Sequence, residues 1–456
     1  MTATVDHYTE TQRGALLETL RAFLRIPSIS TLPEHRPDVD RAAEFVASEL
    51  RQAGLARVHL IEGEGNPLVY GERIEAPGKP TVLCYGHYDV QPPDPLDEWK
   101  SPPFEPAIRG EDIFARGAAD DKGQTLILIK AVEALVQLRG RLPVNVKFLI
   151  EGEEEVGGGH IEKHIREKGR SLGADAALIC DTEMFAPGLP SLCIGLRGIV
   201  YTEVEVTGAR QDLHSGVYGG VAPNPLLDLA RILNGLKDAG GRILIPGFYD
   251  RVRPPDTAEL DAWARLPFDE ERYKRDEVGV EELTGEAGFS VFDRTWARPT
   301  LEVHGIRGGF TGDGAKTVIP ARATAKVSMR LVADMDPAEA FEQFRRHVER
   351  ITPRGVRSRV TLLAASGPSK VDPANGFVRA AAAALTEVFG VPTVYIRSGG
   401  SIPIVGLFAE HARIPSVLMG FGLPDDNLHA PNEKLHLPNF FRGIVAVARY
   451  LELLGE

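Results

Sequence analysis

The chain has 456 residues, of which 43% are hydrophobic and 25% are charged, and this mixture excludes a disordered chain, a coiled coil and a fibrous repeat. Its formal net charge of −12 at pH 7 argues against a nucleic-acid-binding protein, because such proteins present a basic surface. The length predicts two or three domains, or one domain with a large insertion.

The first residues, the apolar runs and the cysteines indicate the cellular compartment in which we expect the protein. The first residues have neither a basic start nor an apolar core, so they do not resemble a signal peptide. No apolar run reaches the roughly 18 residues that a membrane-spanning helix needs. Cys84, Cys180 and Cys193 form no CxxC pair, so we expect no disulfides and a cytoplasmic protein.

Predicted helices and strands alternate in the N-terminal part. Helices are expected over 14–25, 40–53 and 124–138, and strands over 81–86, 144–150 and 176–180. The strands are short and continuously apolar, which is typical of strands that are buried on both faces. This order predicts an α/β domain with a helix-sandwiched central sheet.

The pattern changes near Arg197. Apolar and polar residues alternate in the expected strands 201–206 and 323–332, as in a sheet with one solvated face. A third strand is expected over 359–363, and helices over 225–239 and 337–351. These elements predict a smaller α+β domain.

The first pattern then returns, with helices expected over 376–389 and 439–454 and strands over 393–396 and 416–419. We therefore expect one α/β domain built from residues 1–197 and 369–456, with an inserted domain over 198–368.

Five polar loops lie next to the predicted strands and the apolar helix. Their acidic and imidazole residues are His87 with Asp89, Asp120 with Asp121, Glu153 to Glu155, Asp181, and His429. Each has an ordinary explanation by itself: a turn histidine, a pair of helix caps, a solvated charge run, an Asx turn, and a loop histidine before proline.

Taken together, the loops indicate a metal site. In open α/β sheets, ligands bind beyond the carboxyl ends of the strands, where these loops are expected. Imidazole and carboxylate are the ligands of zinc and similar cations. Five such ligands exceed the need of one tetrahedral ion and suit two metals that share a carboxylate.

Seven motifs occur in a fixed order along the chain: GHYDVQP, RGAADDKGQ, EGEEEVGG, DLHSGVYGG, AKTVIPARATAKVSMRLV, SGGSIP and HAPNEK. In this order they resemble the aminoacylase/carnosinase family of dinuclear zinc exopeptidases, and within it the cytosolic nonspecific dipeptidase branch. The resemblance covers essentially the whole chain. It implies a zinc-exopeptidase-like catalytic domain (1–197 and 369–456) and a lid and dimerisation domain (198–368).

The resemblance implies two divalent metal ions, with zinc as the first choice and manganese or cobalt as alternatives. One ion is expected on His87, Asp120 and Asp181. The other is expected on Asp120, Glu155 and His429, so that Asp120 bridges both. The peptide between Asp120 and Asp121 is expected to be cis.

By the same resemblance, Asp89 orients His87, and Glu154 is the general base that takes a proton from the attacking water. The three consecutive glutamates leave one alternative, because a shift of one position would make Glu153 the base.

The resemblance also assigns substrate contacts. His214 is expected to reach the oxyanion in the partner subunit of a homodimer. Arg330, Gly400 and Ser401 are expected to bind the C-terminal carboxylate of the substrate. The ordinary alternatives are an exposed loop histidine, an exposed strand arginine and a glycine-rich turn before a helix.

These expectations describe a hydrolase that cleaves dipeptides or short peptides next to a free carboxylate. One alternative is an N-acyl-amino-acid deacylase or desuccinylase with the same chemistry. A second, of a different class, is an inactive dimeric scaffold without metal.

Overall fold

The computed structural model describes residues 4–456, which divide into two compact units. Unit 1 combines the N-terminal part up to Ile194 with Val371–Ile396 and Leu407–Glu456. Unit 2 consists of Gly195–Lys370 and Arg397–Gly406.

The segment Arg397–Gly406 lies in unit 2, although the sequence patterns place it in the returning α/β part. Two side-chain contacts explain this difference. Arg397 forms an ion pair with Glu259, and Ser401 accepts a hydrogen bond from Arg330; both partners belong to unit 2.

Unit 1 is built around a mixed β-sheet. In spatial order its strands are β1 (Arg57–Ile61), β2 (Leu68–Arg73), β6 (Asn145–Glu151), β3 (Thr81–His87), β7 (Ala176–Ile179), β17 (Ser416–Leu418) and β8 (Ser191–Leu196), and β16 (Val394–Ser398) pairs with β8. Strand β3 is parallel to both β6 and β7, and β17 is parallel to β7.

The register of the parallel strands brings their ends together. His87 at the end of β3 lies opposite Glu151 at the end of β6, and Tyr85 lies opposite Ile179 at the end of β7. The loops that follow these strands therefore leave the sheet at one common edge, the edge at which open α/β sheets bind ligands.

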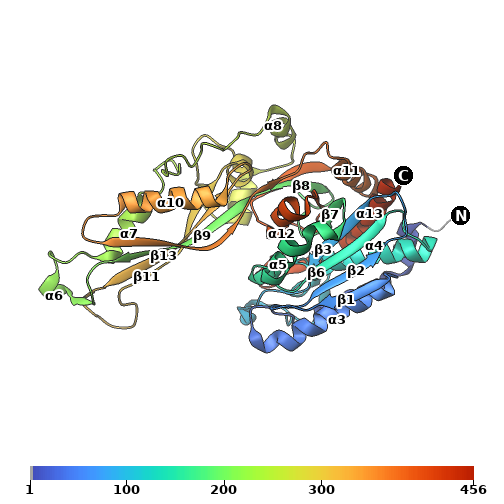
Figure 1. The fold of residues 1–456 in the computed structure, drawn as a ribbon, viewed down its shortest axis with the longest axis horizontal. Helices are drawn as coiled ribbons and strands as arrows, with labels where there is room; N and C mark the ends of the chain where they lie inside the picture. Colours follow the sequence, from blue (N-terminus) through green and yellow to red (C-terminus); the bar gives the residue numbers. More distant parts are fainter. Residues whose placement is uncertain (1–3) are drawn as a thin grey trace. The chain divides into compact units, whose positions relative to one another are not determined.

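Helices cover both faces of this sheet (Figure 1). One face packs in a single apolar core against α2 (Arg13–Leu24), α3 (Arg36–Gln52), α4 (Lys122–Arg139), α11 (Gly376–Phe389) and α13 (Leu437–Gly455). On β3, Cys84 belongs to this core, whereas the ring of the adjacent Tyr85 contacts Phe408. Phe408 begins the turn 408–412, against which α5 (Gly159–Lys168) packs. The predicted helix-sandwiched sheet is confirmed.

Helix α4, which follows Asp120 and Asp121, is buried along most of its length. Almost every residue from Lys122 to Leu135 is buried, including the polar side chains of Lys122, Gln124 and Lys130. The helix ends at Gly140, whose φ of 68° is the left-handed conformation that glycine adopts most readily at a helix end. The Asp120–Asp121 peptide before α4 is cis, as expected.

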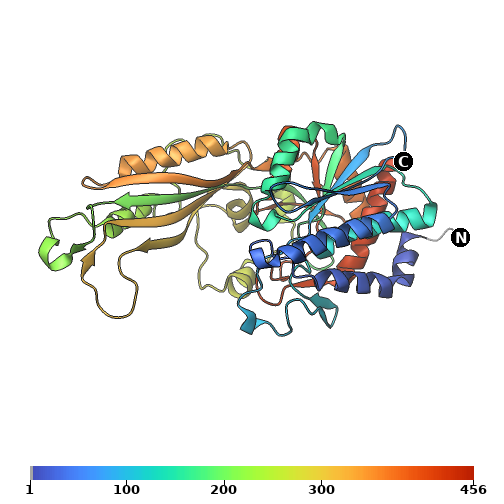
Figure 2. The ribbon, with the colours of Figure 1, turned by 60° about the horizontal axis from the view of Figure 1, so that its bottom comes forward.

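Unit 2 contains an antiparallel sheet in the order β11 (Thr300–Gly308), β13 (Arg322–Leu331), β9 (Gly198–Thr207) and β14 (Arg357–Ser366). Buried and partly buried residues alternate along β9, which is the pattern of a sheet with one packed face. Helices α7 (Pro225–Asn234) and α10 (Pro337–Ile351) pack on this sheet (Figure 2). The predicted smaller α+β fold is confirmed.

The helix predicted over 225–239 is shorter than expected. Helix α7 ends at Asn234, and the Gly235 N–H bonds to the carbonyls of Arg231 and Ile232. Beyond this cap the chain reverses direction in a turn around Gly240, and Lys237 pairs with Ile243 in an isolated antiparallel bridge.

The remaining helices and strands are short: α1 (Val5–Thr11), α6 (Ser215–Tyr218), α8 (Thr257–Ala264), α9 (Glu270–Arg272), α12 (Pro403–Leu407), β4 (Ala107–Arg109), β5 (Asp112–Phe114), β10 (Leu213–His214), β12 (Val318–Ile319), β15 (Ser369–Lys370) and β18 (Lys434–His436). Within residues 4–456, no helix is both long and apolar enough to cross a bilayer.

Candidate metal centre

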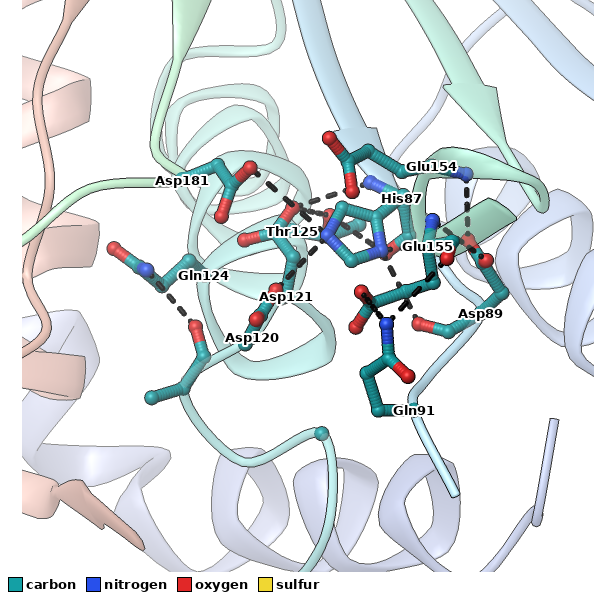
Figure 3. Close-up of polar contacts among 12 residues, drawn as sticks. His87, Asp89, Gln91, Asp120, Asp121, Gln124, Thr125, Glu154, Glu155 and Asp181 are labelled. Atoms are coloured by element: carbon teal, nitrogen blue, oxygen red, sulfur yellow. Dashed lines mark hydrogen bonds and ion pairs between the residues drawn. The ribbon is translucent and has the colours of Figure 1, made fainter. Parts of the chain in front are cut away.

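Five side chains of unit 1 form two groups of potential metal ligands that share one residue. The groups are His87, Asp120 and Asp181, and Asp120, Glu155 and His429. Within each group the ligand atoms lie within 4.8 Å of one another. Figure 3 shows His87, Asp120 and Asp181 pointing toward one another from three different elements.

Asp120 lies between the two imidazoles. Its Oδ1 is 3.1 Å from Nε2 of His87, and its Oδ2 is 2.9 Å from Nε2 of His429. Each carboxylate oxygen therefore faces a different ring, which is the arrangement that a carboxylate bridging two ions requires.

The fold explains how these distant residues meet. His87 is the last residue of β3, and Asp181 follows β7. Glu155 lies in the short turn Glu154–Val156 after β6, and Asp120 precedes α4. His429 comes from the loop before β18, where its φ of 60° is a left-handed conformation that few residues other than glycine adopt.

Asp89 is fully buried and links the histidine to the glutamate loop. The carbonyl oxygen of Asp89 lies 3.1 Å from Nδ1 of His87, and its Oδ1 lies 3.4 Å from the same atom. A proton on Nδ1 would leave the Nε2 lone pair directed at Asp120 and Asp181. The Asp89 carboxylate also accepts the N–H groups of Glu154 and Glu155, at 3.3 and 3.2 Å.

The electrostatics of the cluster are those of a cation site. Burial, together with the charges of Asp121 and Asp120, raises the pKa of Asp181 well above its usual range. Burial and Asp120 likewise raise the pKa of Glu155 to about 8. Like charges in a buried site disfavour ionisation, and a cation among them would reverse this.

The histidines show the complementary effect. The hydrogen bond to Asp120 raises the pKa of His429 to about 9, although burial opposes the shift. Burial also opposes protonation of His87, but hydrogen bonds to Asp120 and Asp89 outweigh it and raise the pKa well above its usual range. Imidazole nitrogens and carboxylate oxygens are ligands of divalent cations such as zinc, and a cation would compensate the negative charge of the carboxylates.

Glu153 and Glu154 have different surroundings. The Glu153 carboxylate accepts the backbone N–H groups of Asn66 and His160, at 2.9 and 3.0 Å. Glu154 lies beside the cluster, where burial raises the pKa of its carboxyl group, His87 opposes the rise, and Asp120 adds to it. Figure 3 shows the Glu154 side chain next to His87.

The sequence did not single out Gln91, which belongs to the cluster. Its Nε2 donates to Oε2 of Glu155 at 2.8 Å (Figure 3). Gln91 stands in the GHYDVQP motif, but an amide in a proline-rich loop gives no signal of its own. Only the folded positions of β3 and the glutamate loop reveal the contact.

Three of the predicted substrate residues meet in unit 2. Arg330 of β13 donates from Nη1 to Oγ of Ser401 at 2.8 Å, and the Ser401 hydroxyl donates to the Arg197 carbonyl at 2.5 Å. The Gly400 carbonyl accepts the Arg197 N–H at 3.1 Å. Burial, and then the charge of Arg330, lower the pKa of Arg197 to about 10, as expected for two neighbouring guanidinium groups.

His214 also belongs to unit 2, at the end of the short strand β10. Its side chain is exposed, and its Nδ1 accepts the Gly216 N–H at 3.0 Å. This contact leaves Nε2 available as a donor.

Comparison with known proteins agrees with this geometry. Residues 83–453 match the model of peptidase family M20/M25/M40. The chain is 34% identical to the human Beta-Ala-His dipeptidase, over 98% of this chain and 91% of the relative. It is 34% identical to the Cys-Gly metallodipeptidase dug1 of Schizosaccharomyces pombe, over 98% of this chain and 96% of the relative.

A solved structure is similar throughout. The M20 family metallo-carboxypeptidase Sso-CP2 from Sulfolobus solfataricus is 33% identical, with a TM-score of 0.87 over 96% of this chain and 99% of that chain. The resemblance drawn from the seven motifs is therefore confirmed. The chain belongs to peptidase family M20/M25/M40 and is a metallopeptidase.

Proposed function

We propose that this protein is a metal-dependent dipeptidase that cleaves the peptide bond next to a free C-terminal carboxylate. The observation that carries the proposal is the pair of ligand groups joined at Asp120, whose two oxygens face two imidazoles. The two relatives are named dipeptidases, and this supports dipeptides over N-acyl amino acids as substrates.

Two divalent ions fit the cluster, one on His87, Asp120 and Asp181 and one on Asp120, Glu155 and His429. We propose zinc, because the set of two imidazoles and three carboxylates suits it; manganese and cobalt are the alternatives. When bound, the ions supply Lewis acidity to the scissile carbonyl and to water.

Glu154 is the proposed general base. It takes a proton from the attacking water and later delivers it to the leaving amine nitrogen. Its position beside the cluster and its raised pKa support this role. The Glu153 carboxylate already accepts two backbone N–H groups, and this argues for Glu154 over Glu153. Asp89 holds the His87 ring in place.

Arg330, Gly400 and Ser401 are proposed to bind the C-terminal carboxylate. A guanidinium group matches a carboxylate in a two-point contact. The Ser401 hydroxyl next to Arg330 can add a third contact once its hydrogen turns from the Arg197 carbonyl to the substrate. An exopeptidase needs such a contact, because the free terminus is what distinguishes its substrate.

His214 is proposed to donate to the oxyanion of the reaction intermediate in the partner subunit of a homodimer. Its exposed ring supports a role outside its own unit.

In this proposal residues 198–368 act as the lid and dimerisation domain, and 1–197 with 369–456 as the catalytic domain. The proposed compartment is the cytoplasm, where Cys84 and Cys180 would remain the buried thiols that they are in the structure.

A paired assay tests the proposal. Metal-free protein is supplied with Zn²⁺, Mn²⁺ or Co²⁺ and given a panel of dipeptides, their C-terminal amides and N-acetyl amino acids. We expect two ions per chain and turnover of the dipeptides, with kcat/KM reduced for the amides. Preferred turnover of N-acetyl amino acids, or full activity without any metal, would contradict the proposal.

A further inference from the structure

Glu433 is a fully buried carboxylate that the proposed chemistry does not use. Four N–H groups surround it. Its Oε2 accepts from Nη1 of Arg116 at 2.7 Å and from the Gly117 N–H at 3.0 Å. Its Oε1 accepts from the N–H groups of Ala119 and Asp120, at 3.0 and 3.1 Å.

These four donors lie in one short segment that ends at the proposed bridging ligand. The segment runs from Arg116 to Asp120, and the last N–H belongs to Asp120 itself. Glu433 comes from the loop that carries His429, and its carbonyl accepts the Ala115 N–H at 3.1 Å. One residue thus ties together the loops that carry Asp120 and His429.

We propose that Glu433 is a positioning residue that fixes Asp120 against His429 and thereby sets the metal affinity of the group Asp120, Glu155 and His429. This inference rests on the proposed metal site. Glu433 itself is no ligand, because both of its oxygens are already occupied by N–H groups.

The ionised side chain is the form that fits this pocket. All four neighbours are donors, and a carboxylate is an acceptor at both oxygens. Glutamine has the same size, but its NH₂ group would face either Arg116 and Gly117 or Ala119 and Asp120. In either orientation two N–H groups lose their acceptor, and the segment before α4 is free to shift.

A purely structural role is the competing explanation, because Arg116 and Glu433 also form a buried ion pair. The chain offers a matched control in the same unit. Glu49 of α3 forms a buried ion pair with Lys130 of α4, at 2.7 Å, and neither residue contacts the cluster. Glu49→Gln should lower the thermal stability without changing metal affinity.

Metal affinity of the apo-protein tests the inference. Metal-free parent, Glu433→Gln and Glu49→Gln are titrated with Zn²⁺ in competition with a chromophoric chelator, and Tm is measured in parallel. We expect two ions on the parent and on Glu49→Gln, with affinities within about threefold of each other. In Glu433→Gln one of the two ions should bind about 10- to 100-fold less tightly, the usual effect of losing a partner that orients a ligand.

Parental affinity for both ions in Glu433→Gln, with a lowered Tm, would show a structural role only and overturn the inference. If Glu433→Gln does not fold, Glu433→Asp decides. It keeps the charge beside Arg116 but is one methylene too short to reach both pairs of donors, so we expect a smaller loss of affinity; parental affinity would again overturn the inference. A parent that binds no zinc would instead refute the proposed function, and the inference with it.

Discussion

Glu153 and Glu154 are neighbours in sequence with different environments, and this difference can be measured. Glu154→Gln removes the proposed proton acceptor while leaving the five candidate ligands in place. General-base catalysis contributes roughly 10²- to 10⁴-fold, so kcat should fall by about that factor. Steady-state kinetics on a dipeptide, with metal content measured on the same sample, checks the result.

Glu153→Gln is the control at the adjacent position. Its carboxylate accepts the N–H groups of Asn66 and His160, so the substitution should cost about 1 kcal/mol of stability and change kcat less than about threefold. A larger loss of kcat in Glu153→Gln than in Glu154→Gln would place the base at Glu153.

At the level of elements, the start of α4 has no space for a larger residue. A Cβ added to Gly123 would lie 2.1 Å from the carbonyl oxygen of Ala118, a backbone atom in the segment that leads to Asp120. Gly123→Ala should therefore displace that segment, lower the free energy of unfolding by about 1–3 kcal/mol and weaken metal binding. Urea unfolding and metal titration measure the two effects.

The start of helix α11, in contrast to the start of α4, has space for a larger residue. A Cβ at Gly376, the first residue of α11, would meet no atom within 4 Å. Gly376→Ala should keep or raise stability, by up to about 1 kcal/mol, because alanine loses less backbone entropy. If both alanine variants behave alike, the crowding at Gly123 is not what fixes the start of α4.

Element boundaries were predictable where local chemistry marks them. Helix α10 has the expected bounds because Asp336 caps it and Pro337 occupies its first turn. The expectation for α7 missed the stop at Gly235. Strand β11 was not predicted, because most of its residues are exposed and its pairing with β13 holds it in place.

The clustering of the candidate ligands was predictable for a different reason. Parallel strands end at one edge, so polar residues after β3, β6 and β7 had to be neighbours. The contacts of Gln91 and Glu433 could not be predicted, because each joins two segments that are adjacent only in the fold. Neither residue belongs to a periodic sequence pattern that would reveal its contact.

For the whole molecule, the proposed role of His214 across a dimer predicts complementation. Glu154→Gln and His214→Ala should each be nearly inactive. If His214 serves the partner's site, a mixed dimer has one site with both defects and one site with none. Statistical exchange between the two variants of a symmetric dimer should then restore roughly a quarter of parental activity. A mixture that stays inactive would mean that His214 does not act across the dimer.

Metal removal should destabilise the protein, and more so at higher pH. Free carboxyl groups of the unfolded chain ionise near pH 4. Burial and like charges raise the pKa of Asp181 and Glu155 in the metal-free fold, that of Glu155 to about 8. A carboxyl group with a raised pKa in the folded state lowers the free energy of unfolding progressively as pH rises from about 5 to about 8.

His429 acts in the same direction. The pKa of His429 is raised to about 9, so the stability contributed by its protonated ring is present below about pH 6.5 and is lost as pH rises through 9. Bound cations favour the ionised carboxylates and the neutral imidazoles, which removes this pH dependence of stability.

An ion present at 100 times its Kd adds about 2.7 kcal/mol to the free energy of unfolding. The difference in Tm between metal-loaded and metal-free protein should therefore widen from pH 6 to pH 8.5. Calorimetry that finds a constant or narrowing difference would show that these groups are not held together by the metal.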